Sequence, residues 1–183
     1  MDPHAPFTGV LLLPDRAMFG TSSPATLEDG QPVAMIRWHR FSGGARFDIL
    51  DPAGGTVLAS GSKKGLFGRR YQVLTPHGEL LLELRISGWG LSGRSTVTLP
   101  LGPTLTAKGN WTSRKFAVTD GQDQLVADLA NTASWLSSRE NLAFRLHRPE
   151  LSLVQAIGLA QCMRAAFVAE SSAAASTAST AAF

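Results

Sequence analysis

The densest group of positive side chains in this sequence lies between residues 63 and 70. Four basic residues, Lys63, Lys64, Arg69 and Arg70, bracket two apolar ones, Leu66 and Phe67. Lys and Arg attract phosphate groups, and each basic residue near an anionic membrane contributes about 1 kcal/mol. The stretch predicts an anion-binding loop in which the apolar pair forms a tip that enters the membrane interface. The alternative is that this pair packs inward and the charges are only solvated.

The positive charge of the whole chain is concentrated around the same stretch. The chain has 183 residues and a net charge of +3, yet residues 61–115 carry nine Lys or Arg against two Glu, a net charge of +7. If these charges share one face, they would attract phosphates, acidic lipids or acidic proteins. Thirteen of the 17 basic residues are Arg, which suits phosphate binding. The alternative is that the high Arg content reflects the base composition of the genome and has no role in binding.

Residues that could carry catalysis or bind a metal are sparse and scattered. The sequence has no phosphate loop, nucleophile elbow or H-E-x-x-H motif, and His4, His39, His77 and His147 are widely spaced. The single cysteine, Cys162, excludes an internal disulfide and lies in an apolar stretch that disfavours its thiolate. A single Tyr, with no interleaving of basic and aromatic residues, argues against nucleic-acid binding. We therefore expect no enzymatic activity, no metal site and no cofactor.

Short strands separated by turn residues account for most of the chain. The 18 Gly and ten Pro are many for a helical bundle, and 44% apolar residues are too many for a disordered chain. Residues 10–13 are expected to form a surface-packed extended segment or a first strand, and residues 20–32 a loop. Eleven further strands are predicted at 33–41, 45–50, 56–60, 70–74, 79–86, 95–99, 104–108, 110–119, 124–129, 132–136 and 141–147. Short strands with Gly, Pro and Asp turns are typical of a meander or a barrel.

One hairpin pattern occurs three times among these strands. Each unit places an aromatic and a β-branched residue two positions apart, hence on one strand face, before a polar turn and an apolar return strand. The units begin at Phe47, Tyr71 and Phe116. Their starts lie 24 and 45 residues apart, which excludes a solenoid of fixed period. The pattern indicates that antiparallel hairpins are the building block of the fold.

A helix that is apolar almost all round is predicted for residues 151–168. Pro149 and Glu150 suit its start, and within it only a serine, two glutamines and Arg164 are clearly polar. Such a helix must be surrounded by protein or by lipid. Its length approaches the roughly 20 residues that cross a bilayer, but a central Arg costs about 2.5–3.5 kcal/mol there. We therefore favour a helix enclosed by the strands over a membrane span.

The repeated hairpins followed by an apolar helix resemble the tubby C-terminal-like superfamily, in its branch of LURP-one-related proteins and phospholipid scramblases. Within residues 109–129, GNW leading into FAVTD and then VADL is similar to the strand pair that precedes the helix in that branch. Within residues 142–151, LAFRL followed by PEL resembles its last strand and the start of its helix. The likeness covers residues 33–169.

The resemblance implies a mainly β fold, a closed antiparallel barrel of about twelve strands wrapped around a buried hydrophobic C-terminal helix. Residues 1–32 would form an N-terminal extended segment and loop, and residues 33–170 the barrel with its central helix at 150–169. Residues 171–183, almost all Ala, Ser and Thr, would form a disordered tail. Scramblases carry an acidic calcium-binding stretch before the helix, but residues 131–140 hold a single carboxylate, so no calcium site is expected.

The resemblance also bears on function, because tubby domains bind phosphoinositide headgroups and scramblases are associated with lipid movement. We expect a non-catalytic module that binds anionic, phosphoinositide-like phospholipid and resides in the cytoplasm or at the membrane periphery. Its candidate binding residues are Lys63, Lys64, Arg69 and Arg70. One alternative is a structural or protein-interaction scaffold with an unknown protein partner, and a second is a scramblase-like protein that moves lipid. The chain is expected to be a monomer and to bind no nucleic acid.

Overall fold

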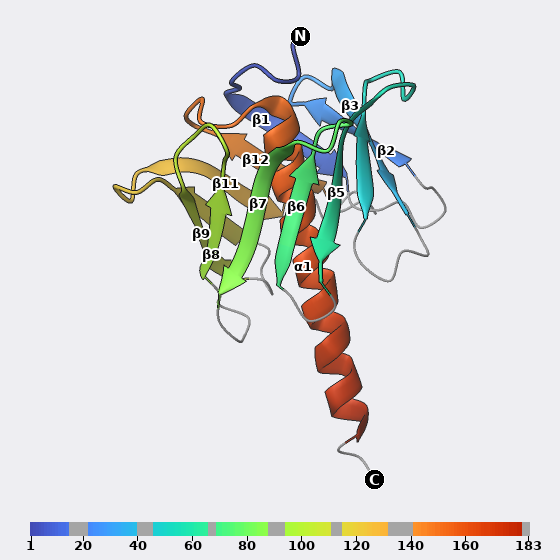
Figure 1. Cartoon of the computed structure of the whole chain (residues 1–183), viewed down its shortest axis with the longest axis vertical. Helices are drawn as coiled ribbons and strands as arrows, with labels where there is room; N and C mark the ends of the chain where they lie inside the picture. The colour runs from blue at the N-terminus through green and yellow to red at the C-terminus, as the bar shows by residue number, and fades with distance from the viewer. Residues whose placement is uncertain are drawn as a thin grey trace.

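The computed structural model describes residues 1–14, 22–39, 46–65, 69–87, 94–110, 115–131 and 141–180. In these residues twelve strands form one closed barrel around a single helix, α1, Leu153–Thr180 (Figure 1). The fold class predicted from the sequence is therefore confirmed. The strands are β1 Gly9–Pro14, β2 Ser22–Leu27, β3 Pro32–Trp38, β4 Phe47–Leu50, β5 Val57–Lys64, β6 Arg70–Leu74, β7 Leu80–Ser87, β8 Arg94–Thr98, β9 Leu105–Asn110, β10 Lys115–Thr119, β11 Leu125–Asn131 and β12 Asn141–Leu146.

Each strand pairs antiparallel with its neighbours in the sequence, and β1 closes the barrel by pairing with β12. Successive strands therefore alternate in direction between the two ends of the barrel. The helix α1 begins at one end, which we call the helix-start end, and emerges from the other, the helix-exit end (Figure 1). The strands β5 and β7 run toward the helix-exit end, and β6 runs away from it (Figure 1).

The core lies between the inner face of the barrel and the first half of α1. In β6, Tyr71 and Val73 are buried while the residues beside them are not, which is the period-two alternation predicted for the repeated hairpins. Gly158 allows α1 to approach β6 closely, because a Cβ atom at this position would lie 2.9 Å from Val73 Cγ2. Between residues 151 and 166 only Gln155 and Arg164 are not fully buried. The predicted enclosure of the helix is therefore confirmed.

The first turn of α1 is closed by side-chain and backbone hydrogen bonds. The Ser152 backbone N–H donates to Gln155 Oε1 at 2.9 Å, and the Gln155 N–H donates to Ser152 Oγ at 3.3 Å. This reciprocal arrangement is a capping box, which satisfies two N–H groups that a helix start leaves without partners. The Val154 N–H donates to the Pro3 carbonyl at 3.1 Å, so the N-terminal segment also closes the helix start.

The barrel begins earlier in the chain than predicted. Of the two alternatives for residues 10–13, the first strand is the one that forms, as β1, whereas the predicted loop at 20–32 contains β2, and both strands belong to the barrel. The sequence of β2 is mostly Ser, Thr, Pro and Ala, and only Ala25 in it is buried. Pairing with β1 on one side and β3 on the other holds this segment extended despite its weak strand pattern.

The helix extends beyond the predicted 150–169, because α1 continues to Thr180 where a disordered tail at 171–183 was expected. Ala is the strongest helix former, and extending an existing helix adds hydrogen bonds without a new nucleation cost. This second half of α1 projects from the helix-exit end (Figure 1). The predicted strand at 132–136 and the last three residues of the tail lie outside the described residues.

Candidate functional site

Two of the four predicted site residues, Lys64 and Arg70, lie side by side at the helix-exit end. Lys64 ends β5, Arg70 begins β6, and the two are direct cross-strand partners. Arg70 is in turn the partner of Arg85 in β7. All three side chains are exposed, and directly opposite residues have Cβ atoms about 4.5–5.5 Å apart. They form a row of three adjacent positive charges on the outside of the barrel.

The row continues across the next three strands. Arg85 pairs with Thr96, and Arg94, two residues before Thr96, lies on the same outer face. Arg94 pairs with Lys108 of β9, and Lys115 is exposed at the start of β10. The six consecutive strands from β5 to β10 thus each contribute one outward cation. We call this set the basic band; it consists of Lys64, Arg70, Arg85, Arg94, Lys108 and Lys115.

Two members of the basic band have carboxylate partners. Arg70 Nε lies 3.3 Å from Glu83 Oε1, and Lys108 Nζ donates to Asp123 Oδ1 at 3.0 Å. The other four members make no ion pair with any residue that the structure describes. Like charges directly opposite each other destabilise an antiparallel pair of strands. A bound anion would relieve this repulsion, so the charges of the band favour an anionic ligand.

The other two predicted residues, Lys63 and Arg69, lie apart from the basic band. Lys63 pairs with Tyr71, which is only 3% exposed, so position 63 belongs to the inward-facing set of β5. Arg69 precedes β6, and its carbonyl accepts a hydrogen bond from the Ile86 N–H at 2.9 Å. Both basic side chains are half-buried at the helix-exit mouth of the barrel. The structure therefore divides the predicted group of four into two pairs.

Arg85 and Arg94 were not predicted as site residues, although both lie in the region of excess positive charge. Pairing the two predicted strands directly across the turn at 75–78, with Leu74 opposite Glu79, would have set Arg70 opposite Glu83. The register shift between Val73 and Leu74 sets Arg70 opposite Arg85 instead, and no local signal in the sequence predicts this shift or places Arg94 beside the pair. Leu66 and Phe67, the predicted membrane tip, lie outside the described residues.

The opposite end of the barrel carries negative charge. Carboxylates are gathered in the described turns at the helix-start end, at Glu28, Asp29, Asp51, Glu79, Asp120 and Asp123. Hydrogen bonds from turn N–H groups hold the pKa of Asp51 and of Asp120 below its ordinary value, so both remain ionised near neutral pH. Arg148 Nη1 lies 2.6 Å from Asp120 Oδ2, and this ion pair neutralises the Asp120 carboxylate. Such a separation of charge orients a molecule in the field of a charged surface.

A buried carboxylate, Asp48 of β4, gathers three polar side chains from neighbouring segments. It lies 2.9 Å from Arg37 Nη2 and 2.8 Å from His39 Nε2, and it accepts a hydrogen bond from Ser60 Oγ at 2.7 Å. Burial alone would raise the pKa of Asp48, but these hydrogen bonds outweigh it and hold the pKa below its ordinary value. The Ser60 hydroxyl faces the carboxylate and not the imidazole, unlike the nucleophile of a Ser–His–Asp triad. The cluster ties three strands together.

The remaining groups that could react or bind a metal are Cys162 and the His, Asp and Glu side chains. Cys162 is fully buried in α1, and burial raises the pKa of its thiol. Within the described ranges, no group of three His, Cys, Asp or Glu side chains is placed to hold a metal ion. No helix in the described part of the chain combines the length and the apolarity needed to cross a membrane.

No protein-family model matches the chain, and no curated protein matches it. The chain is similar to the X-ray structure of a protein from Arabidopsis thaliana, AT5G01750, with a TM-score of 0.62. The two sequences are 16% identical over a superposition that covers 89% of this chain and 94% of the Arabidopsis chain. At this identity the similarity shows the fold alone. The chain thus shares the fold of the Arabidopsis protein, which in this chain is a twelve-stranded barrel with a C-terminal helix.

Proposed function

We propose that the protein binds anionic phospholipid at a membrane surface through the basic band and catalyses no reaction. The observation that carries this proposal is the band itself, one outward cation on each of six consecutive strands. Four of these cations have no carboxylate partner among the described residues, so their charge is available to a ligand.

The strength expected of such a surface is that of reversible, peripheral binding. Each Lys or Arg near an anionic leaflet contributes about 1 kcal/mol, so the four unpaired cations together supply about 4 kcal/mol. Arg85 and Arg94 add directional recognition, because a guanidinium group can donate two parallel hydrogen bonds to one phosphate. The carboxylates at the helix-start end would be repelled by the same surface, which turns the outer wall that carries the band toward the membrane.

The tubby-like fold supports placing the chain in the LURP-one-related branch, and the superfamily's phosphoinositide-binding members support phosphoinositides as the preferred lipid. A scramblase-like role would require α1 to contact lipid, and the enclosure of residues 151–166 by the strands gives that role no support. A protein-interaction scaffold would use the same basic band for an acidic protein, so the test must include both partners.

Co-sedimentation with vesicles tests the proposal. Vesicles of phosphatidylcholine alone should pellet little protein, whereas vesicles that also contain phosphatidylserine or phosphatidylinositol phosphates should pellet it at moderate salt. The double variant Arg85→Gln/Arg94→Gln should bind the acidic vesicles about 30-fold more weakly, because it loses two contributions of about 1 kcal/mol each.

The matched control removes two cations outside the basic band. The double variant Arg46→Gln/Arg145→Gln has the same change in net charge, and both of its side chains are exposed. It should bind acidic vesicles nearly as well as the unaltered protein. Equal losses in the two double variants would show that net charge and not the band drives binding. Equal pelleting by neutral and acidic vesicles would refute the proposal, as would binding to an acidic protein alone.

A further inference from the structure

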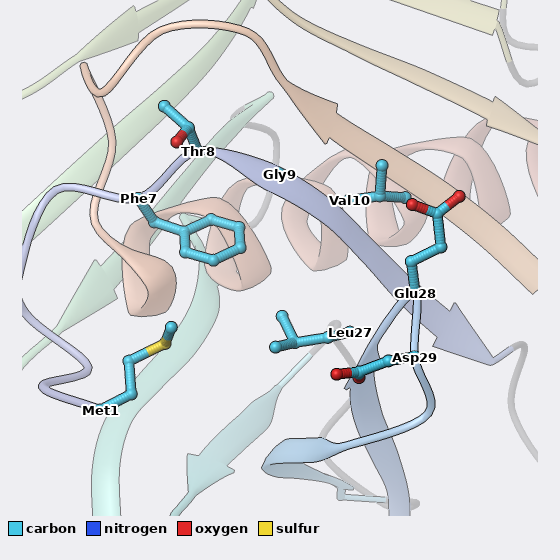
Figure 2. A pocket seen from close by; sticks show the side chains of 8 residues that line it. All are labelled: Met1, Phe7, Thr8, Gly9, Val10, Leu27, Glu28 and Asp29. Atoms are coloured by element: carbon cyan, nitrogen blue, oxygen red, sulfur yellow. The ribbon is translucent and has the colours of Figure 1, made fainter.

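An open groove of about 550 Å³ lies at the helix-start end, between the N-terminal segment and the turn that joins β2 to β3 (Figure 2). The side chains of Met1, Phe7 and Leu27 turn toward one another across it and form an apolar floor (Figure 2). Glu28 and Asp29 follow Leu27 directly and place two carboxylates at the margin of the groove. An apolar floor thus lies next to two acidic groups.

The walls of this groove are held in place by the rest of the fold. Phe7 is 8% exposed, and its N–H donates to the Leu151 carbonyl at 2.9 Å, which fixes the N-terminal segment to the start of the helix. Leu27 packs against the core, and its N–H donates to the Gln31 carbonyl at 2.9 Å across the turn. A binding surface formed before its ligand arrives loses little conformational entropy on binding.

The two carboxylates lack cationic partners within the described structure. Glu28 is exposed and makes no ion pair there, and Asp29 uses Oδ1 to accept a hydrogen bond from the Gln31 N–H at 2.9 Å. None of the residues that line the groove has a cationic side chain. The two carboxylates, without an ion-pair partner in the described residues, favour a cationic occupant.

We propose that this groove docks an extended peptide segment of a partner protein in which an apolar and a basic side chain lie two positions apart, hence on the same face of the segment. An open groove cannot enclose a small molecule, whose sites bury most of the ligand, whereas extended peptides dock in open grooves with alternate side chains seated. An apolar side chain would enter the space between Met1, Phe7 and Leu27. A Lys or Arg two positions along the segment would form charge-assisted hydrogen bonds with Glu28 and Asp29.

This docking site goes beyond lipid binding and does not depend on it. The groove lies at the helix-start end and the basic band toward the helix-exit end, so a molecule held on a membrane by the band would present the groove to solution (Figure 1). Failure of lipid binding would leave the groove and its predicted ligand unchanged.

Fluorescence anisotropy with a labelled, N-acetylated peptide of sequence Arg-Ser-Leu-Ser-Arg, whose Leu and Arg side chains share one face, tests the proposal on the full chain. The double variant Glu28→Gln/Asp29→Asn removes both charges and keeps an acceptor oxygen for the Gln31 N–H. It should bind the peptide about tenfold more weakly, because the charge-assisted contacts are lost. The matched control is Asp51→Asn/Glu79→Gln, which removes an Asp that accepts a turn N–H at 2.8 Å and a Glu, at the same end but outside the groove. This control should bind as the unaltered protein does.

Two further peptides separate the apolar and charged contributions. Arg-Ser-Gly-Ser-Arg should bind about tenfold more weakly than the Leu peptide because it buries no apolar side chain, and Glu-Ser-Leu-Ser-Glu should not bind. Equal affinities of the two double variants, equal affinities of the Leu and Gly peptides, or no binding of the Leu peptide would each overturn the proposal. Self-association that is lost in Glu28→Gln/Asp29→Asn would also overturn it, because the occupant would then be a second copy of the chain.

Discussion

Lys64 and Arg70 face each other directly across β5 and β6, so two positive charges oppose one another on the outer wall of the barrel. Lys64 has no carboxylate partner in the described part of the chain, and Arg70 shares its charge with Glu83 at 3.3 Å. The repulsion between the two cations is a cost to the folded state, and it lies within the surface proposed to bind anions. Stability and ligand binding should therefore respond in opposite directions to a change of charge at position 64.

The variant Lys64→Glu tests this opposition. It places a carboxylate opposite Arg70, and the new pair should raise the free energy of unfolding by about 0.5 kcal/mol. The same change should weaken binding to acidic vesicles, because one cation is lost and an anion is added. Urea denaturation measures the first effect and co-sedimentation the second. Lys64→Gln removes the repulsion without adding attraction, so its free energy of unfolding and its binding to acidic vesicles should both be intermediate. If Lys64→Glu is no more stable than Lys64→Gln, the repulsion between positions 64 and 70 is not a cost to the folded state.

The buried carboxylate of Asp48 should make stability depend on pH in the acidic range. Its pKa in the folded state lies below the ordinary value of 3.8, so its contribution to stability is fully present above that value and is lost as pH falls through the folded pKa. At pH 6, Asp48→Asn should lower the free energy of unfolding by about 1–3 kcal/mol, because Arg37 and Ser60 lose a charged acceptor. Between pH 4 and pH 3 the difference in the free energy of unfolding between Asp48→Asn and the unaltered protein, measured by urea denaturation, should shrink. A difference in the free energy of unfolding between Asp48→Asn and the unaltered protein that stays constant with pH would contradict the prediction.

The core was predictable from the sequence because its signal is local. The alternation of an aromatic and a β-branched residue two positions apart requires no knowledge of distant partners, and all six such residues in the three repeated units are buried: Phe47, Ile49, Tyr71, Val73, Phe116 and Val118. The helix was predictable for the same reason, since a segment with so few polar side chains must be enclosed.

The basic band was only partly predictable because it depends on strand register. Lys64 and Arg70 lie close in the sequence, whereas Arg94 joins them only when β7, β8 and β9 are paired in one particular alignment. A shift of one residue in either ladder would have turned its side chains to the other face. The sequence likewise gave no signal for the groove, because its floor combines Phe7 with Leu27 from a segment expected to be a loop.

The packing of Phe47 over Gly61 gives a prediction about the core. The two residues are cross-strand partners, and a Cβ atom at position 61 would overlap the Phe47 ring. Gly61→Ala should therefore lower the free energy of unfolding by about 1–3 kcal/mol, the usual cost of overpacking, as measured by thermal or urea denaturation. Gly55→Ala is the control, because no atom lies within 4 Å of a Cβ built there.

Restoring space at the ring should rescue the Gly61 variant. Combined with Phe47→Leu, Gly61→Ala should cost less than the sum of the two single changes, because the smaller side chain makes room for the new methyl group. Strictly additive losses would show that the ring is not what opposes a side chain at position 61.

Cys162 reports whether α1 leaves the barrel. Its side chain is fully buried and burial raises its thiol pKa, so the thiolate that reacts with disulfide reagents is both rare and inaccessible. In native buffer Cys162 should react with Ellman's reagent only at the rate of global unfolding, and rapidly once urea unfolds the barrel. A cysteine placed at the exposed position Ala169, in a chain that also carries Cys162→Ala, should react at once in the same buffer.

Adding acidic vesicles should leave Cys162 protected if the protein binds lipid through the basic band. Rapid labelling of Cys162 on vesicles would instead mean that the helix is released into the lipid, which the peripheral binding proposed for the band does not allow.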